Sequence, residues 1–351
     1  MKKKILAILL TVAMVISMTA CGASTTPSAE SPAKNGETAA AEEKVETRYL
    51  TLSAVAASSG LFPYCVSLGE VLSKLPELDI TVAESGGNVA NTRELRIGEV
   101  SIANSISNTD YESYTGTGTT FDGDPFTDFR ILWYYESTPI QVFVAEDTGI
   151  SSLEDLDGQS FNPGGTGTAA SVVMHAALDA LNIHPNYFEA AQADAGDAYA
   201  NRQIVGAVKT GSAPDSYIVQ ANTNRPVKLI NYTDEQLATV LEAIPSVTSG
   251  TVPAGAYDGV DYEIQTLCTY QGIQVDMSFS QELVYKMWKA MWEDYADTWK
   301  TAYVNGANNN VPEMTLQAAK TPLHAGTVQY LTELGYEVPA ELIPPEYVPV
   351  G

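Results

Sequence analysis

The sequence predicts an α/β protein whose folded part consists of two units, each a sheet covered by helices. Three observations predict this class. Strand-like and helix-like segments alternate between residues 49 and 103, a second series alternates between residues 160 and 244, and two apolar β-like segments connect the series. Such alternation with short turns is typical of a parallel sheet with helices on both faces. Ligands of these sheets bind outside the carboxyl ends of the strands.

Length and composition exclude several classes of protein. The 351 residues are enough for two ordinary domains, and the net charge of −25 at pH 7 argues against a nucleic-acid partner. The three histidines do not cluster at metal-ligand spacing, so we predict no metal and no cofactor. The acidic loop with Asp122, Asp124 and Asp128 lacks the terminal Glu of a calcium loop. Cys65 and Cys268 are free to pair in an oxidising compartment, but buried thiols are the commoner case.

Residues 1–20 have the pattern of a secretory signal peptide, in which three lysines precede an apolar stretch. The segment runs into MTACG at residues 18–22, which resembles a bacterial lipobox, so we expect Cys21 to carry a lipid. A plain signal peptide with an incidental cysteine is the alternative. Residues 21–47 are rich in Ser, Thr, Pro, Ala and Glu and predict a flexible tether. We therefore expect a protein anchored by lipid at the extracytoplasmic face of the bacterial cell membrane.

The first alternating series predicts three strands and two helices. In chain order they are a strand at 49–55, a helix around 68–75, a strand at 80–83, a helix at 89–97 and a strand at 100–103. The first helix has apolar residues at i, i+3, i+4 and i+7 and stops at Pro76, and Gly98 caps the second. Small polar loops follow the strands at 58–60, 85–88 and 104–108, which places them on one rim of the sheet. Residues 111–128 predict a further loop.

The second series follows two strands, at 129–135 and 141–145, that lie on either side of Pro139. The second of these strands is expected to cross into another domain. Residues 160–181 then predict a strand, a glycine turn and a helix, and the alternation continues with strands at 187–190, 204–208 and 227–232 and helices near 198, after 214 and at 234–244.

Beyond Thr251 the pattern changes. Residues 252–257 predict a turn, and the apolar, β-like stretch 264–275 is expected to cross back to the first unit. Ser280 caps a helix whose wide apolar stripe extends to Tyr295, and a last helix spans 326–334. The predicted domains are a signal peptide at 1–20, a tether at 21–47, lobe I at 48–139 and 262–351, and lobe II at 140–261.

The glycine turn at residues 162–168 is the most informative part of lobe II. A turn of this kind leaves backbone N–H groups unpaired, and the dipole of the following helix adds partial positive charge. The hydroxyls of Thr166 and Thr168 flank Gly167 and can donate or accept hydrogen bonds. The stretch therefore predicts a binding place for a carboxylate or phosphate. A tight turn with an ordinary N-cap is the alternative interpretation.

Five short segments resemble the TAXI group, the extracytoplasmic solute-binding subunits of TRAP-type transporters. SGGNVANTREL at 85–95 is similar to the family's Thr-Gly-Gly-Ser-Val-Glu-Asn-Leu-Arg motif, and GEVSIA at 98–103 to Gly-Glu-Ala-Asp-Leu-Ala-Ile. NPGGTGT at 162–168 resembles Gly-Pro-Pro-Gly-Ser-Gly-Thr, VPAGAYDG at 252–259 resembles Ile-Pro-Ala-Gly-Thr-Tyr-Pro-Gly, and PLHAGT at 322–327 resembles Pro-Leu-His-Pro-Gly-Ala. The segments occur in family order over nearly all of the folded body.

The resemblance implies a two-lobed periplasmic-binding-protein-like fold of type II, with a ligand cleft between lobes that crossover strands join. It implies a small organic acid as ligand, such as glutamate or 2-oxoglutarate, and the membrane subunits of a TRAP transporter as partner. We expect a monomer and no enzyme, since the sequence has no Gly-x-Ser-x-Gly elbow, P-loop lysine or zinc pattern. The alternatives are a binding protein of an ABC importer, of the nitrate, sulfonate or vitamin-precursor type, and a surface antigen without a small ligand.

The predicted ligand site combines loops of both lobes. Its residues are Ser58, Ser59, Asn88, Asn91, Thr166, Gly167, Thr168, Lys209 and Tyr257. Loop amides and a helix N-terminus hold the carboxylate, and Lys209, Arg93 or Tyr257 supplies a second polar anchor. Two segments depart from the family: its Gly-Gly-x-Tyr-Tyr-Pro reads SSGLFP at 58–63, without either tyrosine, and its Phe-Phe-x-x-Gly-x-Pro reads VKTGSAP at 208–214, which introduces a lysine.

Overall fold

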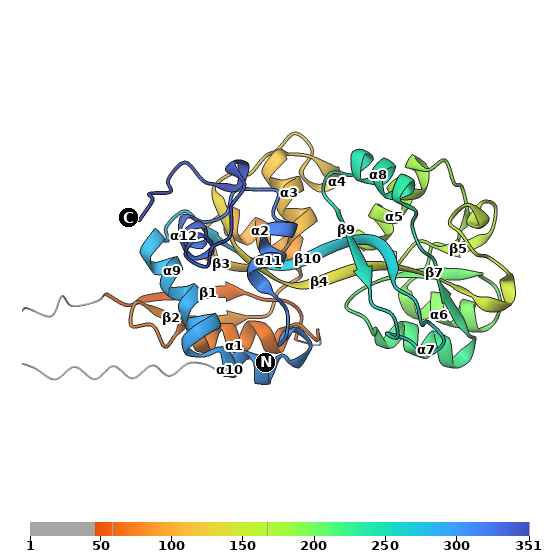
Figure 1. Cartoon of the computed structure of the whole chain (residues 1–351), viewed down its shortest axis with the longest axis horizontal. Coiled ribbons are helices and arrows are strands. Elements are labelled where there is room, and N and C mark those ends of the chain that lie inside the picture. Colours follow the sequence, from red (N-terminus) through yellow and green to blue (C-terminus); the bar gives the residue numbers. More distant parts are fainter. Residues whose placement is uncertain (1–45, 58, 167, 351) are drawn as a thin grey trace, which may run out of the picture. The chain divides into compact units, whose positions relative to one another are not determined.

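The computed structural model describes residues 46–57, 59–166 and 168–350 (Figure 1). The predicted signal peptide, the tether as far as residue 45, and the proposed lipidation of Cys21 lie outside the described residues, as do Ser58 and Gly167. Within the described part, no helix combines the length and the apolar character needed to cross a membrane.

The strands form two sheets that share one strand, β4. In the first sheet, β1 lies between β2 and β3 and is parallel to both, whereas β10 lies antiparallel between β3 and β4. The sheet is therefore mixed rather than purely parallel, because its central strand returns from the far end of the chain. The bounds are β1 (Arg48–Ser53), β2 (Leu78–Ala83), β3 (Ile102–Ile106), β4 (Phe129–Ala145) and β10 (Ile264–Asp276).

The second sheet is built on the last part of β4. There β4 pairs antiparallel with β7 and β8, and β5 lies parallel between β7 and β6. A further strand, β9, pairs with β10; the sequence predicted no element there and placed a turn at 252–257. The bounds are β5 (Ser160–Asn162), β6 (Asn186–Tyr187), β7 (Gly206–Thr210), β8 (Val227–Leu229) and β9 (Thr248–Val252).

Two strands, β4 and β10, pass between the sheets side by side, as predicted (Figure 1). β4 pairs with β10 as far as Pro139 and with β7 from Ile140 onward. The two strands expected around Pro139 are therefore one strand of 17 residues. Pro139 is tolerated because the partner changes at this residue, so no ladder hydrogen bond needs its missing N–H. The predicted α/β class with two lobes and crossover strands is confirmed, and the domain boundary after residue 139 stays a prediction.

Helices pack on both sheets. Their bounds are α1 (Phe62–Leu72), α2 (Asn88–Arg96), α3 (Ser107–Thr115), α4 (Gly118–Phe121), α5 (Ala169–Ala180), α6 (Gln192–Ala200), α7 (Ser216–Asn224), α8 (Asp234–Ala243), α9 (Gln281–Lys289), α10 (Ala296–Ala302), α11 (Val311–Ala318) and α12 (Ala325–Glu333). Short 3-10 turns lie at Glu146–Thr148, Glu154–Leu156, Val304–Gly306 and Ala340–Leu342.

Two parts of the helical prediction are wrong. The loops expected at 104–108 and 111–128 contain the end of β3, α3 and α4, because the buried face of α3 is polar and shows no apolar period. The long helix expected to reach Tyr295 ends at Lys289 and continues as a π-helical turn, Ala290–Asp294, which leaves Tyr295 37% exposed instead of in the core.

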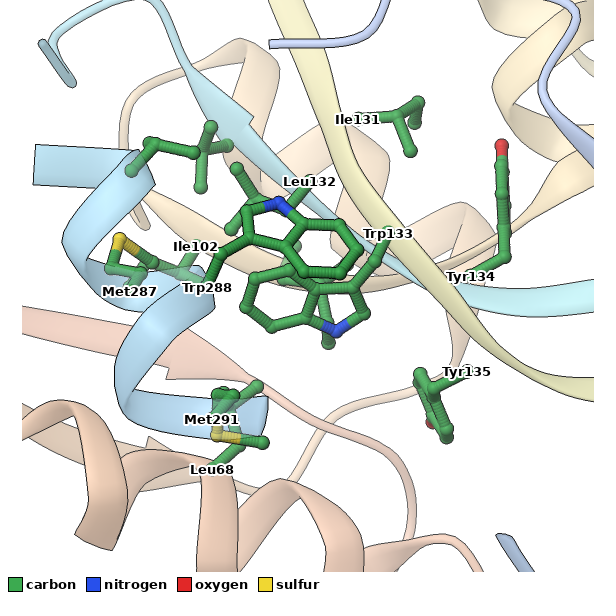
Figure 2. Packing of buried hydrophobic residues seen from close by; sticks show 14 of the residues in the cluster. Leu68, Ile102, Ile131, Leu132, Trp133, Tyr134, Tyr135, Met287, Trp288 and Met291 are labelled. Atoms are coloured by element: carbon green, nitrogen blue, oxygen red, sulfur yellow. The ribbon is translucent and has the colours of Figure 1, made fainter. Parts of the chain in front are cut away.

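The core of the first lobe is aromatic (Figure 2). The rings of Trp133 on β4 and Trp288 on α9 meet edge to face with centroids 5.1 Å apart. Both indole N–H groups have partners: Trp133 donates to the Tyr64 hydroxyl at 2.8 Å, and Trp288 donates to the Thr327 hydroxyl at 2.9 Å. Because each buried polar atom is bonded, these rings pack without an unsatisfied donor.

The two cysteines of the folded body are buried free thiols, Cys65 on α1 and Cys268 on β10. Burial raises the pKa of each thiol to about 12. Both therefore remain protonated at neutral pH and pack as small apolar groups.

Candidate functional site

The register of the sheets directs the carboxyl ends of several strands toward the same stretch of β4. Ile106, at the end of β3, pairs with Gln271, and Gln271 pairs in turn with Glu136 on β4. In the second sheet, β7 ends at Thr210, which pairs with Ile140. Since β1 is parallel to β3 and β5 to β7, the loops that follow these four strands face one another across β4.

Two of the predicted site residues, Asn88 and Asn91, lie on α2 beside these strand ends. Asn91 is fully buried, and its side-chain amide donates to the main-chain oxygens of Ala54 and Asn104, both at 2.7 Å. Its oxygen accepts from the Ser53 hydroxyl at 3.0 Å. Asn91 therefore braces the ends of β1 and β3, and a direct contact of Asn91 with a ligand stays a prediction. Asn88 is half-buried and accepts from the Asn104 amide at 2.9 Å.

These bonds continue into the crossover strands. The Asn104 amide also donates to the side-chain oxygen of Gln271 at 3.1 Å, and Gln271 is the ladder partner of Glu136. Ladder partners present their side chains on the same face of a sheet. Glu136 then accepts from the hydroxyl of Ser212, in the loop after β7. We call these five residues (Asn88, Asn104, Gln271, Glu136 and Ser212) the polar row; it connects the rim of the first sheet to the second.

Glu136 is the charged member of the polar row and is 4% exposed. Its carboxylate also accepts from the Tyr303 hydroxyl at 2.8 Å and from the Asn309 amide at 3.2 Å. A β-bulge between Gln271 and Gly272 shifts the register here, which brings both Tyr135 and Glu136 against Tyr303. Burial raises the pKa of the Glu136 carboxyl, and its three hydrogen-bond donors oppose that rise.

A cavity of about 360 Å³ adjoins Glu136 between the two sheets. Its walls come from β4, from the loop after β7, from the end of β9 and from the segment after α10. The lining residues are Glu136, Ser137, Pro139, Ser212, Ala213, Pro214, Thr251, Pro253, Asn305 and Asn309. Hydroxyl, amide and carboxylate groups thus face a space the size of a small metabolite.

The predicted anion-binding turn precedes α5 as expected. Thr168 is the N-cap and accepts from the Ser171 N–H at 3.3 Å. The N–H groups of Gly164, Thr166 and Thr168 bond within the protein, to the Asn162 side chain and to main-chain oxygens. The alternative interpretation, a turn with an N-cap, accounts for these bonds. The side chains of Thr166 and Thr168 are exposed, so their role in binding an anion stays a prediction.

The two other lobe II residues, Lys209 and Tyr257, lie together near the end of β7. The Tyr257 hydroxyl donates to the Gln141 side chain at 2.7 Å and accepts from the Asp215 N–H at 2.9 Å. Burial raises the pKa of Tyr257 to about 12. The Lys209 ammonium lies 3.7 Å from an Asp215 carboxylate oxygen, so its charge is partly balanced. Tyr257 has a packing role here, and ligand contacts of either residue stay predictions.

The remaining candidates are placed as follows. Ser59 accepts from the Leu61 N–H at 3.2 Å and shapes the start of α1, whereas Arg93 is exposed on α2. Asp124, part of the acidic loop considered for calcium, forms an ion pair with Arg96. Among the residues that the structure describes, there is no group of three or more His, Cys, Asp and Glu side chains placed to bind a metal ion.

Neither Glu136 nor Gln271 is among the residues predicted from the sequence. Each lies in an apolar strand that crosses between the sheets, and the elements that bring them together are 135 residues apart in the chain. The sequence did contain a signal for Glu136. Carboxylates are rarely buried, so a glutamate within an otherwise apolar strand indicates specific hydrogen-bond partners or a functional role.

Comparison with known proteins identifies related sequences and folds. The model of a family described as the NMT1-like family matches residues 52–335. Among solved structures, a TctC solute binding protein from Polaromonas is 14% identical with a TM-score of 0.49, covering 74% of this chain and 88% of that chain. The periplasmic binding protein BugD is 14% identical (TM-score 0.42, 81% and 94% covered), and the aliphatic sulphonate binding protein SsuA from Escherichia coli is 13% identical (0.43, 84% and 95%).

Proposed function

The chain belongs to the NMT1-like family of solute-binding proteins, and from this premise we propose that it captures a small organic acid and delivers it to a TRAP-type transporter. The ligand is of the glutamate or 2-oxoglutarate class. Binding takes place at the extracytoplasmic face of the cell membrane, where a lipid on Cys21 holds the protein. As a solute-binding protein the chain is not an enzyme, and it releases its ligand unchanged.

The observation that carries this proposal is the polar row. It runs from the rim of the first sheet to Ser212 of the second, beside a cavity of about 360 Å³. Two lobes connected through a pair of strands can rotate about those strands, and a ligand bound between them favours the closed arrangement. Closure converts occupancy of the cavity into a shape that membrane subunits can recognise.

An acid as ligand is supported by two features of the second lobe. The exposed hydroxyls of Thr166 and Thr168 stand at the N-terminus of α5, where the helix dipole favours a negative charge. Lys209 adds a positive charge at the end of β7. The net charge of −25 does not oppose this assignment, because local dipoles and single cations bind anions in acidic proteins.

The choice of transporter rests on the five segments similar to the TAXI group, which span residues 85–327. The same proposal includes a monomeric state and two lobes, with lobe I at 48–139 and 262–351 and lobe II at 140–261. A binding protein of an ABC importer is the alternative, and it would share this architecture. The neighbouring genes decide between them: a polytopic permease supports the TRAP assignment, and an ATPase supports the ABC importer.

A thermal-shift screen of the purified protein against dicarboxylates, amino acids and sulfonates tests the function. A ligand present at 100 times its Kd stabilises the folded state by about 2.7 kcal/mol, which gives a clear rise in Tm. Replacing both Thr166 and Thr168 by Ala should then weaken binding of the acid at least tenfold, about 1.4 kcal/mol. An unchanged affinity in calorimetry would show that the turn before α5 does not hold the acid.

A further inference from the structure

The carboxylate of Glu136 is buried between the sheets without a positively charged partner. The ion pairs found among the described residues include none to Glu136, and the nearby Lys209 is paired with Asp215. The donors that do reach Glu136 (Ser212, Tyr303 and Asn309) are all neutral. An ionised Glu136 is therefore hydrogen-bonded but not balanced by a positive charge, which is unusual because buried charges are normally paired.

Glu136 also has capacity for a further donor. An ionised carboxylate accepts about four hydrogen bonds, and three are occupied. The side chain lines the cavity of about 360 Å³, and the uncharged polar groups of Ser137 and Thr251 line the same space. Ser212 is the one donor to Oε1 among the hydrogen bonds of the described residues, whereas Tyr303 and Asn309 both donate to Oε2, so Oε1 can accept a further donor from the cavity.

We propose that Glu136 receives a primary ammonium group of the ligand, so that the solute is an amino acid or a similar zwitterion rather than a simple carboxylate. This inference rests on the proposed function, which already assigns an acid group to the ligand. The ammonium group supplies both the missing charge and a hydrogen bond to the carboxylate. The acid group of the same molecule then binds the loops that follow the strands of the second sheet.

This assignment explains why a carboxylate occupies the crossover strand. A ligand ammonium held by Glu136 contacts a residue that also bonds Ser212 of the second sheet and Tyr303 of the first. Binding there stabilises the contact between the lobes. Glu136 thereby acts as the specificity-determining residue for the positive end of the ligand.

Matched ligand pairs test the proposal on the unaltered full-length protein. Each pair differs only in the ammonium group: L-glutamate and glutarate, L-leucine and 4-methylpentanoate, L-phenylalanine and 3-phenylpropanoate. Thermal shift identifies the pair that binds, and calorimetry gives both affinities. We expect the amino acid to bind at least tenfold more tightly than its partner without nitrogen.

Two variants separate recognition from a structural role of the same residue. Glu136→Gln removes the charge while keeping the size, and it should reduce that tenfold preference to less than threefold. The comparison variant Ser212→Ala removes a hydrogen bond between the lobes but keeps the charge of Glu136, and it should weaken both members of a pair by the same factor. If Glu136 only held the lobes together, both variants would weaken the two members of a pair equally.

The outcomes distinguish this inference from the proposed function. Equal or tighter binding of the partner without nitrogen overturns the role of Glu136 and leaves an acid-binding protein. Failure of every acid, with or without nitrogen, on a protein that unfolds cooperatively overturns both. Should Glu136→Gln not fold, the affinity ratio of the unaltered protein decides alone.

Discussion

A close contact between two helices of the first lobe, α9 and α12, predicts a loss of stability on a single substitution. Gly326, on α12, lies directly against α9: a Cβ atom at this position would be 2.4 Å from the main-chain oxygen of Gln281 and 2.7 Å from the main-chain nitrogen of Tyr285. Both atoms belong to the backbone, so no change of rotamer relieves the contact. In Gly326→Ala, α9 and α12 must therefore move apart.

The magnitude follows from two opposing effects. Overpacking a core costs about 1–3 kcal/mol. Because the contacts of Gly326→Ala are to backbone atoms that cannot rotate away, we expect a cost of about 3 kcal/mol. Alanine stabilises a helix by about 1 kcal/mol relative to glycine, which offsets part of this cost. We expect a net loss of about 2 kcal/mol in the free energy of unfolding, which lowers Tm by roughly 3 °C for a folded body of about 300 residues.

Gly196→Ala is the matched control, because Gly196 also lies inside a helix, α6. There the added Cβ would be 3.2 Å from the ring of Tyr217, which lines a surface cavity of about 410 Å³ and has room to move. We expect the control to be as stable as the unaltered protein or more stable, in thermal and urea unfolding. Equal stabilities of the two variants would refute the close crossing of α9 and α12.

Two buried titratable groups predict opposite pH dependences. Burial raises the pKa of Asp110 to about 7, so its contribution to stability is present below its usual value of 3.8 and is lost as the pH rises through 7. Asp110→Asn keeps an acceptor for the hydroxyls of Ser105 and Tyr134. Its stability should not fall as the pH rises, so at pH 8 the variant should be more stable than the unaltered protein. Burial lowers the pKa of His324 to about 4, so stability should fall as the pH drops from about 6.5 to 4, and His324→Asn should lack that fall. Tm measured from pH 4 to 8 checks both, and a variant that follows the curve of the unaltered protein contradicts its assignment.

How far the sequence predicted the fold depended on where each element buries apolar groups. β10 and α12 are largely buried, and their predicted bounds differ from the observed ones by no more than one residue at either end. α3 was missed because it buries Asn108, Asp110 and Ser113, which a hydrophobic period cannot detect. Pro139 led to the prediction of two strands instead of one. A proline interrupts a strand only where a ladder hydrogen bond needs its missing N–H, and local sequence does not show which residues make such bonds.

The candidate site was harder to predict than the fold. Loops at the carboxyl ends of strands follow from topology, and the sequence indicated Asn88 and the turn before α5 on that ground. The polar row depends instead on the pairing of Gln271 with Glu136, and on a bulge that brings Glu136 to Tyr303. Pairing between distant strands cannot be derived from local patterns in one sequence, so the most buried charge of the site escaped prediction.

The position of β10 has a consequence for the order in which the chain folds. β10 separates β3 from β4 in the first sheet, yet it is the last of the described strands along the chain. The strands β5 to β8 come from a continuous stretch, residues 160–229, so they and β4 are available to pair before residues 264–276 are synthesised. Until residues 264–276 arrive, β3 and β4 lack the neighbour that joins them, and their backbone groups stay open to wrong partners. The half of the protein that begins the chain is thus completed last.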